Sequence, residues 1–312
     1  MLLPMNRNLL LWSGVAALNL LSGPALSAPL YWDKSMAAGY QGGDGTWSAN
    51  AADTNWSANG VNLSAWADGY DPTFAANDGT PSFIALTNAV SGGALTISGA
   101  KYTVAVTNGG QIASGSATSL IGTGNNSANN TLAVIGGAGV KSLWDLGAQP
   151  LYVGYNAATA TNNLLLIDGA GVPGSAVVTN VGYPGNYTFY VGQSPANGNR
   201  MIITNGGALF YNGNGYSVLG SASNTVIVTG AGSLWSHYGL YITGCPNTMR
   251  VENGGSVSNT YLWMRAGGSS SNQVIVSKGG RWQGYIDYIG MVGGDENNNS
   301  VSVIGGVGVT SL

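Results

Sequence analysis

The chain has 312 residues, of which 51 are glycine and only 7% are charged, and its formal net charge is −3. Its nine Lys and Arg residues are scattered singly, so there is no basic stripe to track phosphates, and the composition argues against nucleic acid as a partner. An apolar fraction of 44% also argues against a disordered low-complexity chain and favours a solenoid of β-strands with glycine at the turns.

Residues 1–28 read as a secretory signal peptide. Arg7 supplies the basic n-region, Leu9 to Leu21 form the apolar core, and Pro24 to Ala28 offers small residues for cleavage. The apolar core of about 13 residues is shorter than the roughly 20 that a transmembrane helix needs. The sequence therefore predicts export to the cell surface, the outer membrane or the extracellular medium.

Large aromatic residues and acids set apart the next block, residues 29–90, which holds six of the 12 acidic residues. We interpret this block as an irregular, Trp-rich N-terminal cap that shields the open edge of a solenoid, since Trp buries a large apolar area. The alternative is a carbohydrate-binding surface in which Trp47 and Trp56 stack on sugar rings.

Residues 91–312 form a repeat array, of which Asn224 to Trp235 is the clearest copy. Each unit has a strand that ends at Gly, as in Tyr152 to Gly154, then an Asn followed by an apolar, any, apolar triplet, a Gly-rich corner and a third short strand. Three strands and three bends per unit predict one turn of an all-β parallel β-helix. The Asn recurs at seven positions: Asn130, Asn163, Asn199, Asn224, Asn247, Asn272 and Asn299.

The alternation within each triplet predicts which side chains face the core. The outer members face inward: Leu132/Val134, Leu165/Ile167, Met201/Ile203, Val226/Val228, Met249/Val251, Val274/Val276 and Val301/Val303. The middle members face outward: Ala133, Leu166, Ile202, Ile227, Arg250, Ile275 and Ser302. Because most of the outward residues are apolar, we expect this face either to be covered by another segment or to be an interaction surface.

The recurrent Asn needs no ligand to explain it. Stacked in register, its amides can hydrogen-bond from coil to coil, and Asn tolerates bend conformations that β-branched residues refuse. We therefore predict a structural asparagine ladder along one corner, with no metal and no cofactor at these positions.

The strongest candidates for catalysis fail on spacing or number. Asp168 and Glu252 occupy the same repeat position three coils apart, hence about 14 Å, beyond the roughly 5 to 9.5 Å that glycosidase carboxylates need. His237, the single histidine, is expected in a surface loop, and Arg250 is expected to point outward beside Glu252. Cys245 is read as a small corner residue, and the Gly-rich loops at Asp44 and Gly293 to Asn297 fit no established calcium motif.

The segments Val228 to Trp235, Gly239 to Ile242 and Val251 to Ser258 resemble the repeats of bacterial autotransporter-type passengers. This resemblance to the autotransporter-associated β-strand repeat proteins implies a right-handed β-helix displayed at or released from the cell surface, often as an adhesin. Its pattern includes no catalytic residues. The family's C-terminal barrel or sorting tail is absent, and Gly306 to Leu312 repeat Gly137 to Leu143, so we expect an N-terminal fragment whose membrane anchor is missing.

The sequence thus predicts a structural or adhesive surface protein that presents loops such as Val181 to Tyr187 and Gly293 to Ser300 to surface glycans or proteins. Two alternatives remain: a polysaccharide lyase or hydrolase on a β-helix scaffold, and a carbohydrate-binding module. A cluster of acids or of Arg and Lys on adjacent coils would favour the enzyme.

Overall fold

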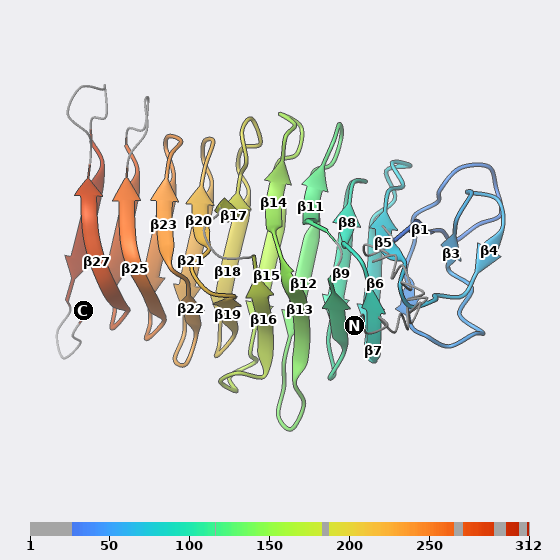
Figure 1. Cartoon of the computed structure of the whole chain (residues 1–312), viewed down its shortest axis with the longest axis horizontal. Helices are drawn as coiled ribbons and strands as arrows, with labels where there is room; N and C mark the ends of the chain where they lie inside the picture. The colour runs from blue at the N-terminus through green and yellow to red at the C-terminus, as the bar shows by residue number, and fades with distance from the viewer. Residues whose placement is uncertain are drawn as a thin grey trace, which may run out of the picture.

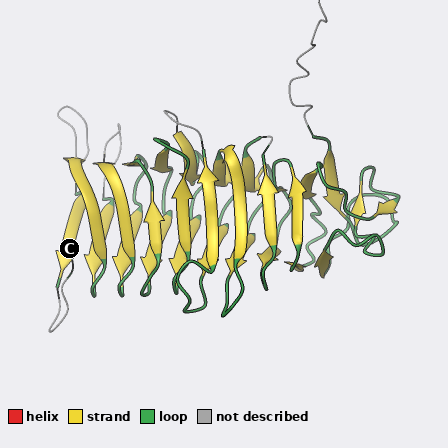
Figure 2. Cartoon of the chain, turned by 60° about the horizontal axis from the view of Figure 1, so that its bottom comes forward, coloured by secondary structure: helices red, strands yellow, loops and turns green. Residues whose placement is uncertain are grey.

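A computed structural model describes residues 27–115, 117–182, 187–264, 271–289, 298–305 and 311. These residues form 28 β-strands and no helix, and the strands stand side by side along the long axis (Figures 1 and 2). Accordingly, the described part contains no helix that is long and apolar enough to cross a membrane. The chain is all-β, with long sheets of parallel strands in a β-helix-like solenoid. Residues 1–26 of the predicted signal peptide, Arg265, residues 183–186 and 293–297 of the predicted loops, and 306–310 lie outside the described residues.

The first sheet has ten strands, and every neighbouring pair is parallel. In order these are β2 (Gly45–Trp47), β6 (Ser82–Leu86), β9 (Tyr102–Val106), β12 (Thr131–Ile135), β15 (Leu164–Asp168), β18 (Arg200–Thr204), β21 (Thr225–Thr229), β24 (Thr248–Glu252), β26 (Gln273–Ser277) and β28 (Ser300–Ile304). The predicted register of the triplets is confirmed: Leu132 lies opposite Leu165, and Leu165 opposite Met201.

The second sheet contains two rows of parallel pairings. One row is β7 (Ala89–Gly92), β10 (Gln111–Ser114), β13 (Ser142–Gln149), β16 (Ala176–Val181), β19 (Ala208–Tyr211) and β22 (Leu234–Ser236). The other is β1 (Pro29–Trp32), β5 (Asp71–Phe74), β8 (Thr96–Ile97), β11 (Ser119–Thr123), β14 (Leu151–Tyr155), β17 (Tyr187–Val191), β20 (Tyr216–Leu219) and β23 (Gly239–Ile242). Both rows meet in the long strands β25 (Ser256–Met264) and β27 (Arg281–Ile289).

The inward triplet members form the core, as predicted. From Leu132 to Val276 these side chains are at most 1% exposed, because each β-branched or long aliphatic residue packs against its equivalent in the next strand. The last pair differs: Val303 is 57% exposed, since β28 is the last strand of this sheet among the described residues. Of the outward members, Ala133 is buried, whereas Leu166, Ile202, Ile227 and Ile275 are half-buried and form a partly exposed aliphatic row.

Residues 29–90 are more regular than expected. Strands β2 and β6 join the ten-stranded sheet and β1, β5 and β7 join the second sheet through parallel pairings. Only β3 (Trp56–Ser57) and β4 (Leu63–Ser64) add antiparallel pairings, β3 with β1 and β4 with β3. Residue 90 is therefore no structural boundary, because the segment Ser82 to Leu86 buries Ile84 and Leu86 as the later triplets do.

Candidate functional site

The seven recurrent asparagines lie in one column, each directly ahead of a strand of the ten-stranded sheet. From Asn130 to Asn272, the backbone N–H of each Asn donates a hydrogen bond to the side-chain Oδ1 of the next, at 2.7 to 3.1 Å. The side-chain Nδ2 of Asn130 and of Asn163 also donates to the next Oδ1, at 3.0 Å in both cases. The bond common to the column thus runs from backbone to side chain, and it satisfies buried N–H groups at a bend.

A glycine in each of three coils makes room for the asparagine of the next coil. Gly154 has φ +78°, and a Cβ built there would lie 2.1 Å from Nδ2 of Asn199. Gly122 and Gly192 stand in the same relation to Asn163 and Asn224. The strand-ending Gly and the Asn of the repeat are therefore one steric unit, and this column of asparagines is structural.

Trp47 and Trp56 are not a sugar-binding platform. Both side chains are 0% exposed, and their ring centroids are 5.4 Å apart within a cluster that also contains Trp32, Trp66 and Phe74. The indole Nε1 of Trp32 donates to the carbonyl of Gly43 at 3.1 Å. The alternative interpretation, a carbohydrate contact at these two residues, is contradicted, because their rings fill the core instead of the surface.

The prediction that His237 lies in a surface loop is also wrong. His237 follows β22, is 6% exposed and stacks on Trp235 with ring centroids 4.2 Å apart. Neither ring nitrogen has a partner at hydrogen-bonding geometry. Burial lowers the pKa of His237 to about 3. The nearby backbone of Gly239 acts in the opposite direction, but its effect on the pKa is smaller than that of burial. The ring is therefore neutral at physiological pH.

The charged candidates are engaged in local contacts. Asp168 and Glu252 lie in one row three strand pairings apart, as predicted. Glu252 accepts a hydrogen bond from Nη2 of Arg250 at 2.8 Å, and Asp168 accepts from the backbone N–H of Ala170 at 2.8 Å. Asp44 accepts from the N–H of Phe83, Cys245 is free and half-buried, and the described residues hold no group of three or more His, Cys, Asp or Glu suited to a metal.

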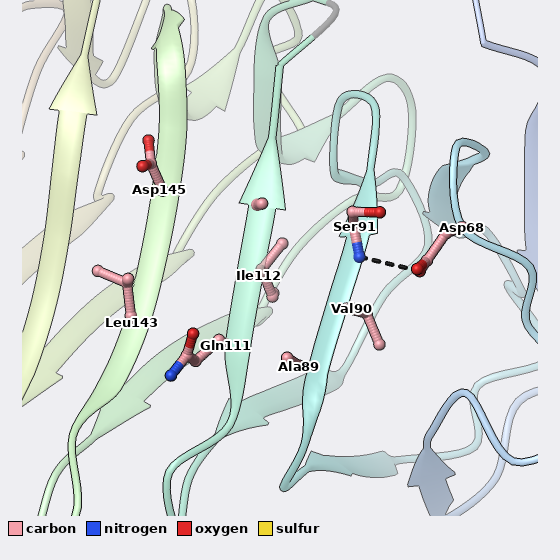
Figure 3. Close-up of a pocket in the computed structure, with 9 residues that line it drawn as sticks. Asp68, Ala89, Val90, Ser91, Gln111, Ile112, Leu143 and Asp145 are labelled. Atoms are coloured by element: carbon pink, nitrogen blue, oxygen red, sulfur yellow. Dashed lines mark hydrogen bonds between the residues drawn. The ribbon is translucent and has the colours of Figure 1, made fainter.

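A groove of about 300 Å³ crosses the outer faces of β7, β10 and β13 (Figure 3). Asp68 at one end accepts from the backbone N–H of Ser91 at 2.9 Å, and Asp145 lies at the other end, on β13. Asp145 accepts from Nδ2 of Asn180 at 2.8 Å and from the N–H of Gly147 at 2.9 Å. The two carboxylates are separated by β10, and each accepts hydrogen bonds from groups of neighbouring strands, so they do not form a general acid and base pair.

An aromatic surface covers the outer side of β17, β20, β23 and β25. These four strands lie next to one another and point upward in Figure 1. Neighbouring rings in it have centroids 4.4 to 5.8 Å apart. We call it the aromatic face, and its members are Tyr187, Tyr216, Tyr238, Tyr241, Tyr261 and Trp263. Tyr187 is 48% exposed and the others are half-buried.

The Tyr-Val-Gly strand endings of the repeats do not by themselves predict this face. The available signal was the repeat position: Tyr152 lies opposite Tyr190, and Tyr241 opposite Trp263, in adjacent strands. A glycine again permits the packing, because a Cβ on Gly239 would lie 2.8 Å from Cδ1 of Tyr216 and 2.9 Å from Cζ3 of Trp263.

The strands that carry the aromatic face hold no charged residues. Strands β14, β17, β20, β23 and β25 contain no Asp, Glu, Lys or Arg. Burial, followed by the nearby Tyr152 and Tyr187, raises the pKa of Tyr190 beside this face to about 12, so its hydroxyl stays protonated at neutral pH. The surface therefore combines ring area with phenol groups that can donate and accept hydrogen bonds.

Comparisons of the chain with protein-family models, with curated proteins and with solved structures gave no match. Its function is accordingly inferred from its own residues and geometry.

Proposed function

We propose that this protein is an exported structural or adhesive β-helix of the bacterial cell surface, without a catalytic role. The observation that carries the proposal is the unbroken parallel pairing of ten strands, from β2 to β28, beside a hydrogen-bonded asparagine column. Such a solenoid is an elongated rod, and a rod can hold a binding surface away from its point of attachment.

The finer architecture belongs to the same proposal: right-handed coils of three short strands, closed at the N-terminal end by the Trp-rich block. In the middle of the array each strand pairs with the strand three places later in the chain: β12 with β15, β13 with β16 and β14 with β17. This spacing supports three strands per coil. The buried cluster around Trp47 and the antiparallel strands β3 and β4 support the cap. The autotransporter-type resemblance supports the right-handed sense.

Export is supported by the signal-peptide pattern of residues 1–28. The resemblance of the repeats to autotransporter-type passengers agrees with it, and loops such as residues 181–187 and 293–300 would then be presented outside the cell. A polysaccharide lyase or hydrolase gains no support from Asp168 and Glu252, which lie three pairings apart.

The test is to express the full chain in a Gram-negative host beside a version that lacks residues 1–28. We expect the full chain to be processed near Ala28 and recovered outside the cytoplasm, and the truncated version to stay inside. Cells that export the chain should attach to polysaccharide-coated or protein-coated surfaces more than cells carrying the truncated version. An unprocessed full chain found in the cytoplasm would refute export, and equal attachment would refute the adhesive role.

A further inference from the structure

The aromatic face has properties that a purely structural role does not require. It gathers five rings on four successive strands and a sixth, Tyr238, just ahead of β23, whereas Trp47 and Trp56 are buried in the N-terminal cluster. Partly exposed Tyr and Trp rings are costly to leave in water and are enriched where proteins bind partners. Their concentration on one side of a solenoid marks a recognition surface.

The rings do not form one closed stack. Tyr241 and Tyr261 are nearly parallel to Trp263, with interplanar angles of 28° and 22°. Tyr187 stands at 80° to Tyr241, and Tyr238 at 82° to Tyr261. Ring planes of two perpendicular orientations therefore meet on this face, which gives a ligand both ring edges and ring faces to contact.

We propose that the aromatic face binds a neutral polysaccharide chain. Hexose rings present C–H groups that pack on aromatic rings, and hydroxyl groups that pair with phenol hydroxyls. The aromatic face supplies both kinds of contact without a single charged side chain in its strands. This proposal rests on the adhesive role proposed above and specifies the chemistry of the partner.

The spacing of the face favours a polymer. Parallel strands are about 4.8 Å apart, so the four strands from β17 to β25 span about 14 Å along the solenoid. Tyr152 and Tyr190, whose ring centroids are 4.9 Å apart, continue the aromatic row on β14 and β17. A repeating ligand can place equivalent groups against equivalent rings, whereas a single small molecule would use only part of this row.

The charge of the face decides between classes of polymer. Binding an anionic polysaccharide or a nucleic acid depends on Lys and Arg, and these strands contain neither. The ion pair of Arg250 and Glu252 lies on β24, which belongs to the other sheet. A neutral chain is therefore the partner that the surface chemistry fits.

The test measures retention of the purified chain on insoluble cellulose, chitin and xylan, with alginate as an anionic comparison. We expect retention on at least one neutral polymer. In Tyr187→Ala and in Trp263→Ala the apparent Kd should rise about tenfold, the size expected for losing one aromatic contact. Ile227→Ala, which alters an outward half-buried residue of the other sheet, serves as the matched control and should bind as the parent does.

Because Trp263 packs against several rings, its variant is compared with Tyr187→Ala, whose side chain is the most exposed of the six and whose loss should leave the far-UV circular dichroism unchanged. Equal retention of the parent and Tyr187→Ala, or retention on alginate alone, would overturn the proposal. Self-association that is lost in Trp263→Ala, without retention on any neutral polymer, would assign the face to a second copy of the chain instead. Retention on a polymer by a chain that never leaves the cytoplasm would sustain this site while refuting the proposed surface role.

Discussion

Two buried corners of the same solenoid satisfy their polar groups to different extents. The asparagine corner repeats one residue, and each Oδ1 accepts the backbone N–H of the coil before it. The corner between the two rows of the second sheet, which we call the mixed corner, has different residues at the equivalent position of successive coils: Val181, Tyr211, His237 and Asn259.

The mixed corner leaves buried polar atoms without protein partners. Both ring nitrogens of His237 and Oδ1 of Asn259 have no hydrogen-bond partner, whereas the hydroxyl of Tyr211 pairs with that of Ser217 at 2.7 Å. Stacking identical residues in register satisfies a buried corner, since each side chain then meets the same group in the next coil. A corner with unlike residues does not provide a hydrogen-bond partner in every coil.

The largest expected effect is from Asn199→Leu in the asparagine corner. Oδ1 of Asn199 accepts from both the backbone N–H and Nδ2 of Asn163, and its Nδ2 donates to the carbonyl of Asn197. Removing the amide leaves the N–H groups of Asn163 and the carbonyl of Asn197 without hydrogen-bond partners in the core. The free energy of unfolding measured by chemical denaturation should fall by about 4 kcal/mol. The exposed Asn212→Leu is the control and should change it by less than about 0.5 kcal/mol. A loss no larger than that of the control would mean that the column does not hold the corner together.

The steric fit of Gly154 against Asn199 can be separated from its backbone conformation. Gly154→Ala and Gly171→Ala place a Cβ at similar positive φ, +78° and +83°, but only the first meets a neighbour, while Gly171 faces open space. We expect Gly171→Ala to cost about 1 kcal/mol from strain alone. Gly154→Ala should cost about 3 kcal/mol, since the buried asparagine must shift. Equal losses in thermal unfolding would show that the two residues are not a steric unit.

The pH dependence of stability tests the mixed corner. The pKa of His237 is about 3 in the folded chain against 6.5 unfolded, so the folded state resists protonation. The stability contributed by the neutral ring is fully present above pH 6.5 and is lost as the pH falls from 6.5 towards 3, at up to about 1.4 kcal/mol per pH unit. Unfolding measured at pH 7.5 and pH 5 should show this loss, and His237→Phe should show a smaller one. The same loss in both proteins would assign the pH dependence to other groups.

The smallest effect is expected from Asn259→Leu, the mixed-corner counterpart of Asn199→Leu. Asn259 makes one hydrogen bond, from Nδ2 to the carbonyl of Tyr261 at 2.8 Å, and its Oδ1 has no partner. Losing the hydrogen bond lowers the free energy of unfolding, whereas removing the unpartnered oxygen raises it. The net change in the free energy of unfolding should therefore be about 1 kcal/mol or less at pH 8. A loss as large as that of Asn199→Leu would erase the difference between the two corners.

The seven strands from β12 to β28 of the ten-stranded sheet, and their register, follow from the sequence alone. An alternating triplet such as Val226 to Val228 states locally which side chains face inward, and the Asn ahead of it fixes the same phase in every repeat. These features can be predicted without the tertiary structure because each repeat contains the same local pattern.

Only the tertiary structure decided which residues are buried outside that pattern. Trp47 and His237 lie in segments without a repeated alternation, and their burial depends on Trp56 and Tyr211, which the fold brings against them. The aromatic face needed the pairing of Tyr241 with Trp263, residues in different coils. Burial and surface clusters depend on contacts between coils, and a local pattern specifies such contacts only where every coil repeats it.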